Sequence, residues 1–128
     1  MNLEGRKIIV NKSVNHLVGM LKNPEDYKNL MPESLQNFEV RDNGFKFGLK
    51  GMPEIALKID NVTDNQVVLK SASSSLDFAL TGNMNPISDS QTEVQLLFNG
   101  KFNPFIKMMV EKPLQNFIDS LTNQIEKL

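Results

Sequence analysis

The sequence has 128 residues and no cysteine, and its 14 basic and 15 acidic residues give a net charge of −1. A chain of this length can bury a core as a single domain, and the lack of cysteine excludes disulfide bonds and thiolate metal sites. The basic residues are scattered rather than clustered along the chain, which argues against a nucleic-acid partner.

The N-terminal segment does not resemble a signal peptide. It carries Glu4 ahead of a short apolar run and has no small-residue cleavage site. No apolar stretch is long enough to span a bilayer, and there is no linker, low-complexity tract or internal repeat. We therefore expect residues 1–128 to form a single cytoplasmic domain. The sequence pattern does not specify its oligomeric state.

The chain begins with a predicted strand and two predicted short helices. Residues 3–10 predict the strand, because the run ends in three β-branched side chains. Ser13 is placed to cap a helix over residues 14–21, whose apolar side chains recur at helical spacing. A second helix is predicted from Pro24 to about Met31, since proline is tolerated in a first turn and the proline that follows disfavours helix.

From residue 34 to residue 99 the apolar period changes to two. This alternation predicts antiparallel strands with one apolar face and one wet face, joined by short turns. The expected turns are Asp42-Asn43-Gly44, residues 51–53 and residues 64–65, with a loop over residues 86–90. Together with the first strand, the pattern predicts a curved sheet of about seven strands.

The C-terminal segment predicts a long amphipathic helix that covers the sheet. Asn103 is placed to cap this helix and Pro104 to start it, while Pro113 predicts a kink or a break. Its apolar residues are Phe105, Met108, Met109, Leu114, Phe117, Ile118, Leu121, Ile125 and Leu128. The predicted class is thus α+β: a curved antiparallel sheet, two short helices after its first strand, and a long C-terminal helix packed on it.

Four local segments resemble parts of a known family. They are Tyr27-Lys28-Asn29-Leu30-Met31-Pro32, Gly51-Met52, the stretch from Phe98-Asn99-Gly100 to Asn103-Pro104, and Pro113-Leu114 with Phe117 and Leu121. With the order of elements, they resemble the START-like (SRPBCC, birch-pollen-allergen-like helix-grip) superfamily, closest to its small bacterial branch of polyketide cyclase and lipid-transport-like proteins. The resemblance covers essentially the whole chain. It implies a cavity between sheet and last helix for a lipid, polyketide or other apolar molecule, and it implies no single activity.

The apolar residues that face the predicted interior either fill a core or line a ligand cavity. The candidate cavity residues are Phe45, Phe47, Leu49, Ile55, Leu57, Ile59, Leu69, Phe78, Leu80, Leu96, Phe98, Phe105, Met108, Met109 and Phe117. Ser71, Ser73 and Asn83 are candidates for the few polar groups that orient a ligand. A cavity for a small apolar molecule between the sheet and the last helix is the leading functional hypothesis.

No catalytic constellation, metal site or cofactor motif is visible. The one histidine, His16, has no identifiable partner, and we expect it to be a surface residue or a partly buried helix residue. Glu25 and Asp26 suit a helix start, and Asp77 and Glu93 fall on the wet phase of their strands. Two alternatives stay open: an enzyme of the polyketide cyclase or dehydratase kind, and a closed-core module that binds a partner.

Overall fold

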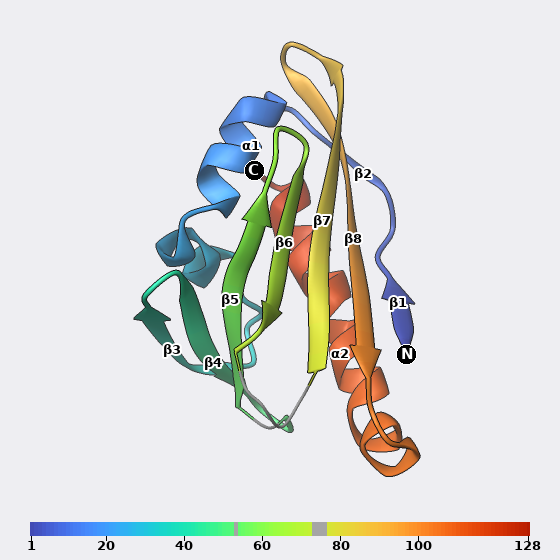
Figure 1. The fold of residues 1–128 in the computed structure, drawn as a ribbon. Helices are drawn as coiled ribbons and strands as arrows, with labels where there is room; N and C mark the ends of the chain where they lie inside the picture. The colour runs from blue at the N-terminus through green and yellow to red at the C-terminus, as the bar shows by residue number, and fades with distance from the viewer. Residues whose placement is uncertain (53, 73–76) are drawn as a thin grey trace.

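The computed structural model describes residues 1–52, 54–72 and 77–128. In these ranges the chain forms an eight-stranded antiparallel sheet in the order β1-β8-β7-β6-β5-β4-β3, with β2 also paired to β8. One long helix crosses one face of the sheet (Figure 1). The elements are β1 (Asn2–Glu4), β2 (Ile8–Val10), α1 (Val14–Leu21), the 3₁₀ helix η1 (Pro24–Leu30), β3 (Leu35–Arg41), β4 (Gly44–Leu49), β5 (Ile55–Val62), β6 (Gln66–Ser71), β7 (Asp77–Ser88), β8 (Gln91–Lys101) and α2 (Pro104–Glu126). The predicted α+β class is confirmed.

The predicted turn between β3 and β4 is confirmed in detail. Asn43 adopts a φ of 58°, a conformation that asparagine tolerates better than most residues. Its side-chain amide donates to the carbonyl oxygen of Ile59 at 2.8 Å, which ties the turn to β5. A Cβ on Gly44 would run into the backbone oxygen of Leu57, so this position requires glycine.

The predicted first strand is wrong in one respect, because it is split into β1 and β2. Both pieces pair with β8, β1 opposite residues 97–99 and β2 opposite residues 92–94. Between them the chain lies against α2 at Gly5, where a Cβ would be 3.0 Å from Oγ1 of Thr122 and 3.2 Å from Cγ2 of Ile118. The step from Glu4 to Ile8 is one residue longer than the facing step from Leu97 to Val94, so the chain bulges between β1 and β2 and the strand is interrupted.

The predicted loop over residues 86–90 is also wrong. β7 continues to Ser88 and pairs with β8 almost to the turn, with Pro86 opposite Thr92. On its other side, β7 pairs with β6 only as far as Asn83. Proline is therefore tolerated here, because the neighbouring strand that would need its N–H has already ended.

The predicted helix caps are confirmed. The Ser13 side chain accepts from the backbone N–H of His16 at 3.1 Å, and the Asn103 side chain accepts from that of Ile106 at 2.9 Å. η1 ends before Met31 as predicted. α2 runs without a break through Pro113, so of the two outcomes predicted there, a kink or a break, the break is not found. Proline removes only one backbone donor there, and core contacts on the C-terminal side hold the helix.

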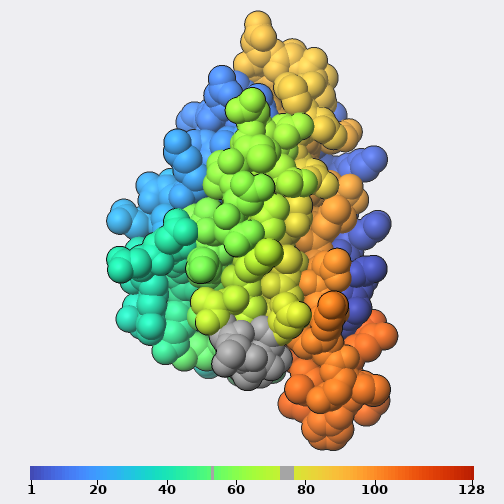
Figure 2. Space-filling view, in the orientation of Figure 1, coloured from blue at the N-terminus to red at the C-terminus, as the bar shows by residue number. Residues whose placement is uncertain are grey.

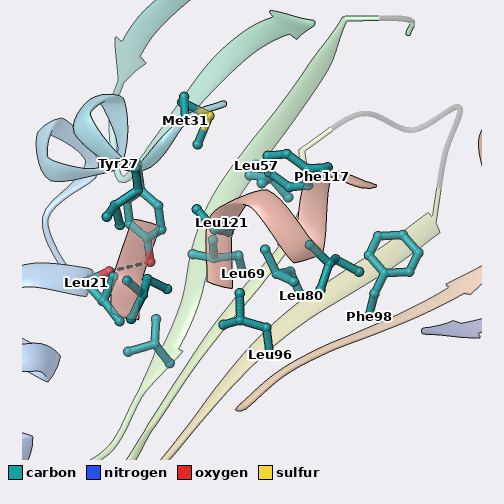
Figure 3. Packing of buried hydrophobic residues seen from close by; sticks show 14 of the residues in the cluster. Leu21, Tyr27, Met31, Leu57, Leu69, Leu80, Leu96, Phe98, Phe117 and Leu121 are labelled. Atoms are coloured by element: carbon teal, nitrogen blue, oxygen red, sulfur yellow. Dashed lines mark hydrogen bonds between the residues drawn. The ribbon is translucent and has the colours of Figure 1, made fainter. Parts of the chain in front are cut away.

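The core lies between the sheet and α2, and α1 and η1 close its remaining side by contacts to β6, β7, β3 and β4. The buried residues of α2 are Val110, Leu114, Phe117, Ile118, Leu121, Thr122 and Ile125. Figure 3 shows Leu69 and Leu80 of the sheet facing Leu121 of α2. Within the described residues, no helix has the length and apolar character needed to cross a membrane.

Candidate ligand pocket

Most of the predicted cavity residues come together in the interior. Each of them is at most 7% exposed: Phe45, Phe47, Leu49, Ile55, Leu57, Ile59, Leu69, Phe78, Leu80, Leu96, Phe98 and Phe117. The rings of Phe47 and Phe117 stack with centroids 5.2 Å apart, so sheet and helix are in direct contact at this point. These side chains therefore pack against one another as a core.

A pocket lined by described core residues has a volume of about 20 Å³, and we call it the interior void. Its lining residues are Leu21, Tyr27, Val67, Leu69, Leu80, Gly82, Leu96, Leu121 and Ile125. A volume of this size is close to that of one water molecule, and such a water would need two or more polar partners. The void is far smaller than the cavities that hold organic ligands, which begin at roughly 300 Å³.

A larger pocket of about 340 Å³ opens at the edge of the core. It lies between the middle of α2, the β4–β5 turn and the segment that follows η1. Its described lining residues are Pro32, Ser34, Leu49, Lys50, Gly51, Met52, Pro113, Asn116, Phe117 and Ser120. Two of these, Leu49 and Phe117, were predicted to line a cavity. The pocket is thus open to solvent on one side and backed by the core on the other.

The rim of this pocket is polar and its wall is apolar. Leu49 and Phe117 are buried and form the wall, while Ser34 and Asn116 are exposed at the rim. Lys50 is the one charged side chain among the described lining residues. An apolar wall with a few polar groups at one end suits a molecule that is itself apolar at one end and polar at the other.

Sequence reasoning missed the rim of the pocket, although two signals pointed toward it. Gly51 and Met52 were recognised as a turn, and Gly51 does adopt a positive φ of 83°. Pro113 was recognised as an interruption of α2. Neither signal shows that the turn lies beside the helix, because that proximity depends on how the sheet curves around α2.

Three of the predicted cavity residues are exposed, and their assignment to the interior is wrong. Phe105 is 71% exposed, Met108 is 80% exposed and Met109 is 58% exposed. The reason is their position on the helix, since each lies about two and a half turns before a buried residue and so on the opposite face. The buried counterparts are, in the same order, Leu114, Phe117 and Ile118.

Of the polar residues that were expected to orient a ligand, Ser71 and Asn83 are not among the lining residues of the pocket. Asn83 lies on the outer face of the sheet, where its side-chain oxygen accepts from Nε2 of Gln66 at 2.8 Å. Ser71 is half-buried and shares the inward phase of Val67 and Leu69 on β6. Ser73 lies outside the described residues. The polar rim of the pocket comes instead from the β4–β5 turn and from α2.

Tyr27 supplies the polar atom beside the interior void. Its hydroxyl donates to the carbonyl oxygen of Leu21 at 2.7 Å, drawn as a dashed line in Figure 3. Its ring stacks on Phe45 with centroids 4.7 Å apart. Burial raises the pKa of this phenol above its usual range, because the anion would lose its hydration. The side chain is therefore a structural group whose hydroxyl is already bonded.

The other pKa shifts also move away from neutrality. The hydrogen bond from Lys46 lowers the pKa of Glu54, and the hydrogen bond from Arg6 lowers the pKa of Glu126. A general acid or base works best with a pKa near the operating pH, so these groups are not tuned for such catalysis. In the described ranges, no three His, Cys, Asp or Glu side chains gather as a metal site would require.

The remaining candidate residues lie away from the pocket. His16 is exposed on α1, as expected for a surface residue, and its backbone N–H takes part in the helix cap. Asp77 is exposed, and Glu93 lies on the outer face of the sheet. The outward direction predicted for these two carboxylates is confirmed.

No protein-family model matches the sequence, and no curated protein matches it. Solved structures match its fold. The solution structure of KanY protein has a TM-score of 0.78 at 8% identity and covers 99% of this chain and 95% of that chain. Norcoclaurine synthase from Thalictrum flavum, in complex with dopamine and hydroxybenzaldehyde, has a TM-score of 0.72 at 12% identity. The match covers 99% of this chain and 84% of the synthase chain. A START superfamily protein from Mycobacterium smegmatis has a TM-score of 0.65 at 12% identity. The match covers 98% of this chain and 97% of that chain. At identities this low, the TM-scores establish a shared fold and nothing about a shared activity.

Proposed function

Since the chain has a START-like helix-grip fold, we propose that it binds a small amphipathic molecule with an apolar body and an anionic end. The observation that carries the proposal is the pocket of about 340 Å³, which has Leu49 and Phe117 in its wall and Lys50 as its one charged described lining residue. The volume falls at the lower end of the range for organic ligands. A fatty acid or a carboxylated polyketide fits this chemistry.

The pocket at the edge of the core, and not the interior, is the proposed site. The interior void is about 20 Å³, so a ligand there would have to displace packed side chains. Phe117 lines the pocket and stacks on Phe47 of the sheet, so the core holds this side of the pocket in place. A ligand held in the pocket therefore needs no rearrangement of the core.

Ligand binding can be tested by filling the pocket. Native mass spectrometry of the purified chain should show a co-purified small molecule, and fatty acids should raise its melting temperature by mass action. Ser120→Phe places a ring in the pocket and should abolish both effects. Glu111→Phe, at an exposed site on the same helix outside the pocket lining, is the matched control and should retain them. An empty protein with no thermal shift would overturn the proposal.

The role of Lys50 can be tested separately with a pair of ligands. A fatty acid should bind more tightly than the alcohol of the same chain length, because only the acid pairs with the ammonium. Lys50→Gln should remove most of this preference and leave alcohol binding unchanged, as measured by calorimetry. Equal affinities for acid and alcohol in the unaltered chain would exclude the anionic end of the proposed ligand.

A closed-core module that binds a partner is the second candidate function. The small interior void favours it, because a filled core has no room for a deeply buried ligand. In that case the pocket would stay empty, and Ser120→Phe would have no effect on any binding activity of the chain. The enzymatic alternative stays a prediction, with no support from the described pocket residues.

We also propose that the chain is located in the cytoplasm. The sequence has no cysteine, which is compatible with a reducing compartment. Cell fractionation followed by immunodetection of the untagged chain tests this location. Recovery of the chain outside the cell would contradict it.

A further inference from the structure

The first turns of α2 project from the body of the protein. The buried residues of the helix begin at Val110, although the helix itself begins at Pro104. In Figure 1 these turns extend past the lower end of the sheet, and Figure 2 shows them as a separate orange lobe below the body. We call residues 101–112 the α2 tip.

The α2 tip carries an apolar face that contacts no part of the core. Phe105, Met108 and Met109 are all more than half exposed and lie on the helix face opposite to the buried one. Phe102 and Ile106 are half-buried and pack against the core, so the base of the tip is anchored. Three large apolar side chains thus stand together in water on a firmly attached helix end.

The tip is also positively charged. Lys101, Lys107 and Lys112 are exposed there, against the single carboxylate of Glu111. The segment therefore carries a net charge of +2 on a chain whose net charge is −1. The dipole of α2 adds a further partial positive charge at this end of the helix. Positive charge is concentrated at the same end of the molecule as the exposed apolar face.

We propose that the α2 tip docks on an anionic lipid surface. An apolar helix face, with Lys112 beside it and Lys107 on the opposite side of the same helix end, suits the boundary between headgroups and acyl chains of a membrane with negative lipids. A second copy of the chain is a poorer occupant, because a symmetric contact would bring two lysine-rich tips together.

The docking inference can be tested with a fluorescent side chain at its centre. The sequence contains no tryptophan, so Phe105→Trp creates a single probe in the full chain. With vesicles of phosphatidylcholine and phosphatidylglycerol, its emission should shift to the blue and the protein should float with the vesicles. With phosphatidylcholine alone both signals should be much weaker. Ile87→Trp, at another exposed apolar position, should show no shift.

Substitutions in the tip separate its two contributions. Lys107→Gln and Lys112→Gln should each weaken partitioning onto anionic vesicles about fivefold, and added salt should weaken it further. Met108→Ser with Met109→Ser should reduce binding at every salt concentration. Lys28→Gln, at an exposed site on η1, is the matched charge control and should leave binding unchanged.

Two results would overturn the docking inference. The first is an unshifted Phe105→Trp emission with anionic vesicles while circular dichroism shows a folded chain. The second is concentration-dependent self-association, measured by sedimentation, that Met108→Ser abolishes, since the apolar face would then bind a second copy. The ligand proposal is tested by Ser120→Phe, which lies outside the tip, so either idea can fail without the other.

Discussion

The two parts of α2 share similar apolar side chains but have opposite environments. From Val110 to Ile125 the apolar residues pack under the sheet, and Phe117 stacks on Phe47. Before Val110, Phe105 and its neighbouring methionines stand in solvent. The comparison shows that apolar composition does not determine burial. Helical phase determines which face a residue occupies, and the extent of the sheet determines whether that face is covered.

The attachment of the second part of α2 to the N-terminal strands strengthens this contrast. Nε2 of Gln115 donates to the backbone oxygen of Glu4 at 3.2 Å, and the guanidinium of Arg6 makes two contacts to the Glu126 carboxylate, at 3.0 and 2.7 Å. Gly5 lets the helix approach closely between these two contacts. The second part is therefore held by the core on one side and by polar contacts along the split first strand.

The largest expected effect separates the two parts of the helix directly. Phe117→Ala should lower the free energy of unfolding by about 3–5 kcal/mol, because it removes a buried ring and leaves a cavity. Phe105→Ala should change the same quantity by no more than about 0.5 kcal/mol, because its ring is largely hydrated already. Urea denaturation of both variants measures the difference. Equal losses would mean that the tip is part of the core.

A smaller effect is expected at the contact between Gly5 and α2. Gly5→Ala should cost about 1–3 kcal/mol, because its Cβ would lie 3.0 Å from Oγ1 of Thr122. Thr122→Ala removes that oxygen, so the double variant should be more stable than the sum of the two single losses predicts. Urea denaturation of the four chains measures this coupling. Strict additivity would show that the helix does not press on this glycine.

The expected effect of Tyr27 is smaller and depends on pH. Tyr27→Phe removes the hydrogen bond to Leu21 and should cost about 0.5–1.5 kcal/mol near neutral pH. Since burial raises the pKa of Tyr27 above 10.0, its contribution to stability is complete below about pH 10, where both states are protonated. As the pH rises further, the unfolded chain loses the phenolic proton first and the folded state is weakened.

The pH dependence can be isolated by comparing the two chains. The difference in unfolding free energy between the unaltered chain and Tyr27→Phe should be constant at neutral pH and should shrink or reverse toward about pH 11. Lysine titration affects both chains equally and cancels in the difference. A difference that does not change with pH would mean that the phenol of Tyr27 is accessible to solvent in the folded state.

The smallest effect is expected at Thr122. Its hydroxyl is buried and has no hydrogen-bond partner among the described residues, although the rest of the side chain packs in the core. Thr122→Val keeps the shape and removes the unpaired group, so we expect a change between zero and about 1 kcal/mol in the stabilising direction. A marked destabilisation in thermal melts would reveal a hydrogen bond to this oxygen.

Local patterns were enough to predict most of the fold. The period of two indicated the strands, the Asn43-Gly44 dipeptide located a turn, and Ser13 and Asn103 located the helix starts. Each of these features depends on neighbours in sequence. The split between β1 and β2 was not predictable in this way, because it depends on their register against β8, a strand far along the chain.

The candidate site was predicted only in part. The inward phase of Phe47 and Phe117 was correct, but their direct stacking, which fills the interior, depends on the distance between sheet and helix. The exposure of Phe105 could have been predicted from the sequence, because two and a half helical turns separate it from Leu114 and place the two on opposite faces. The sequence prediction nevertheless assigned both to one apolar face. The pocket rim required a tertiary arrangement, because Lys50 and Asn116 come from segments that meet only in the folded chain.

The volume of the interior void depends on the side chains that line it. Its lining is aliphatic apart from Tyr27 and Gly82, so shortening one or two leucines would enlarge it without exposing a polar group. In the other direction, a methyl group on Gly82 would meet Cδ2 of Leu96 at 3.6 Å, an ordinary contact distance. Changes in side-chain volume alone can therefore give the same backbone either a filled core or a ligand cavity. A few substitutions would separate these two kinds of function.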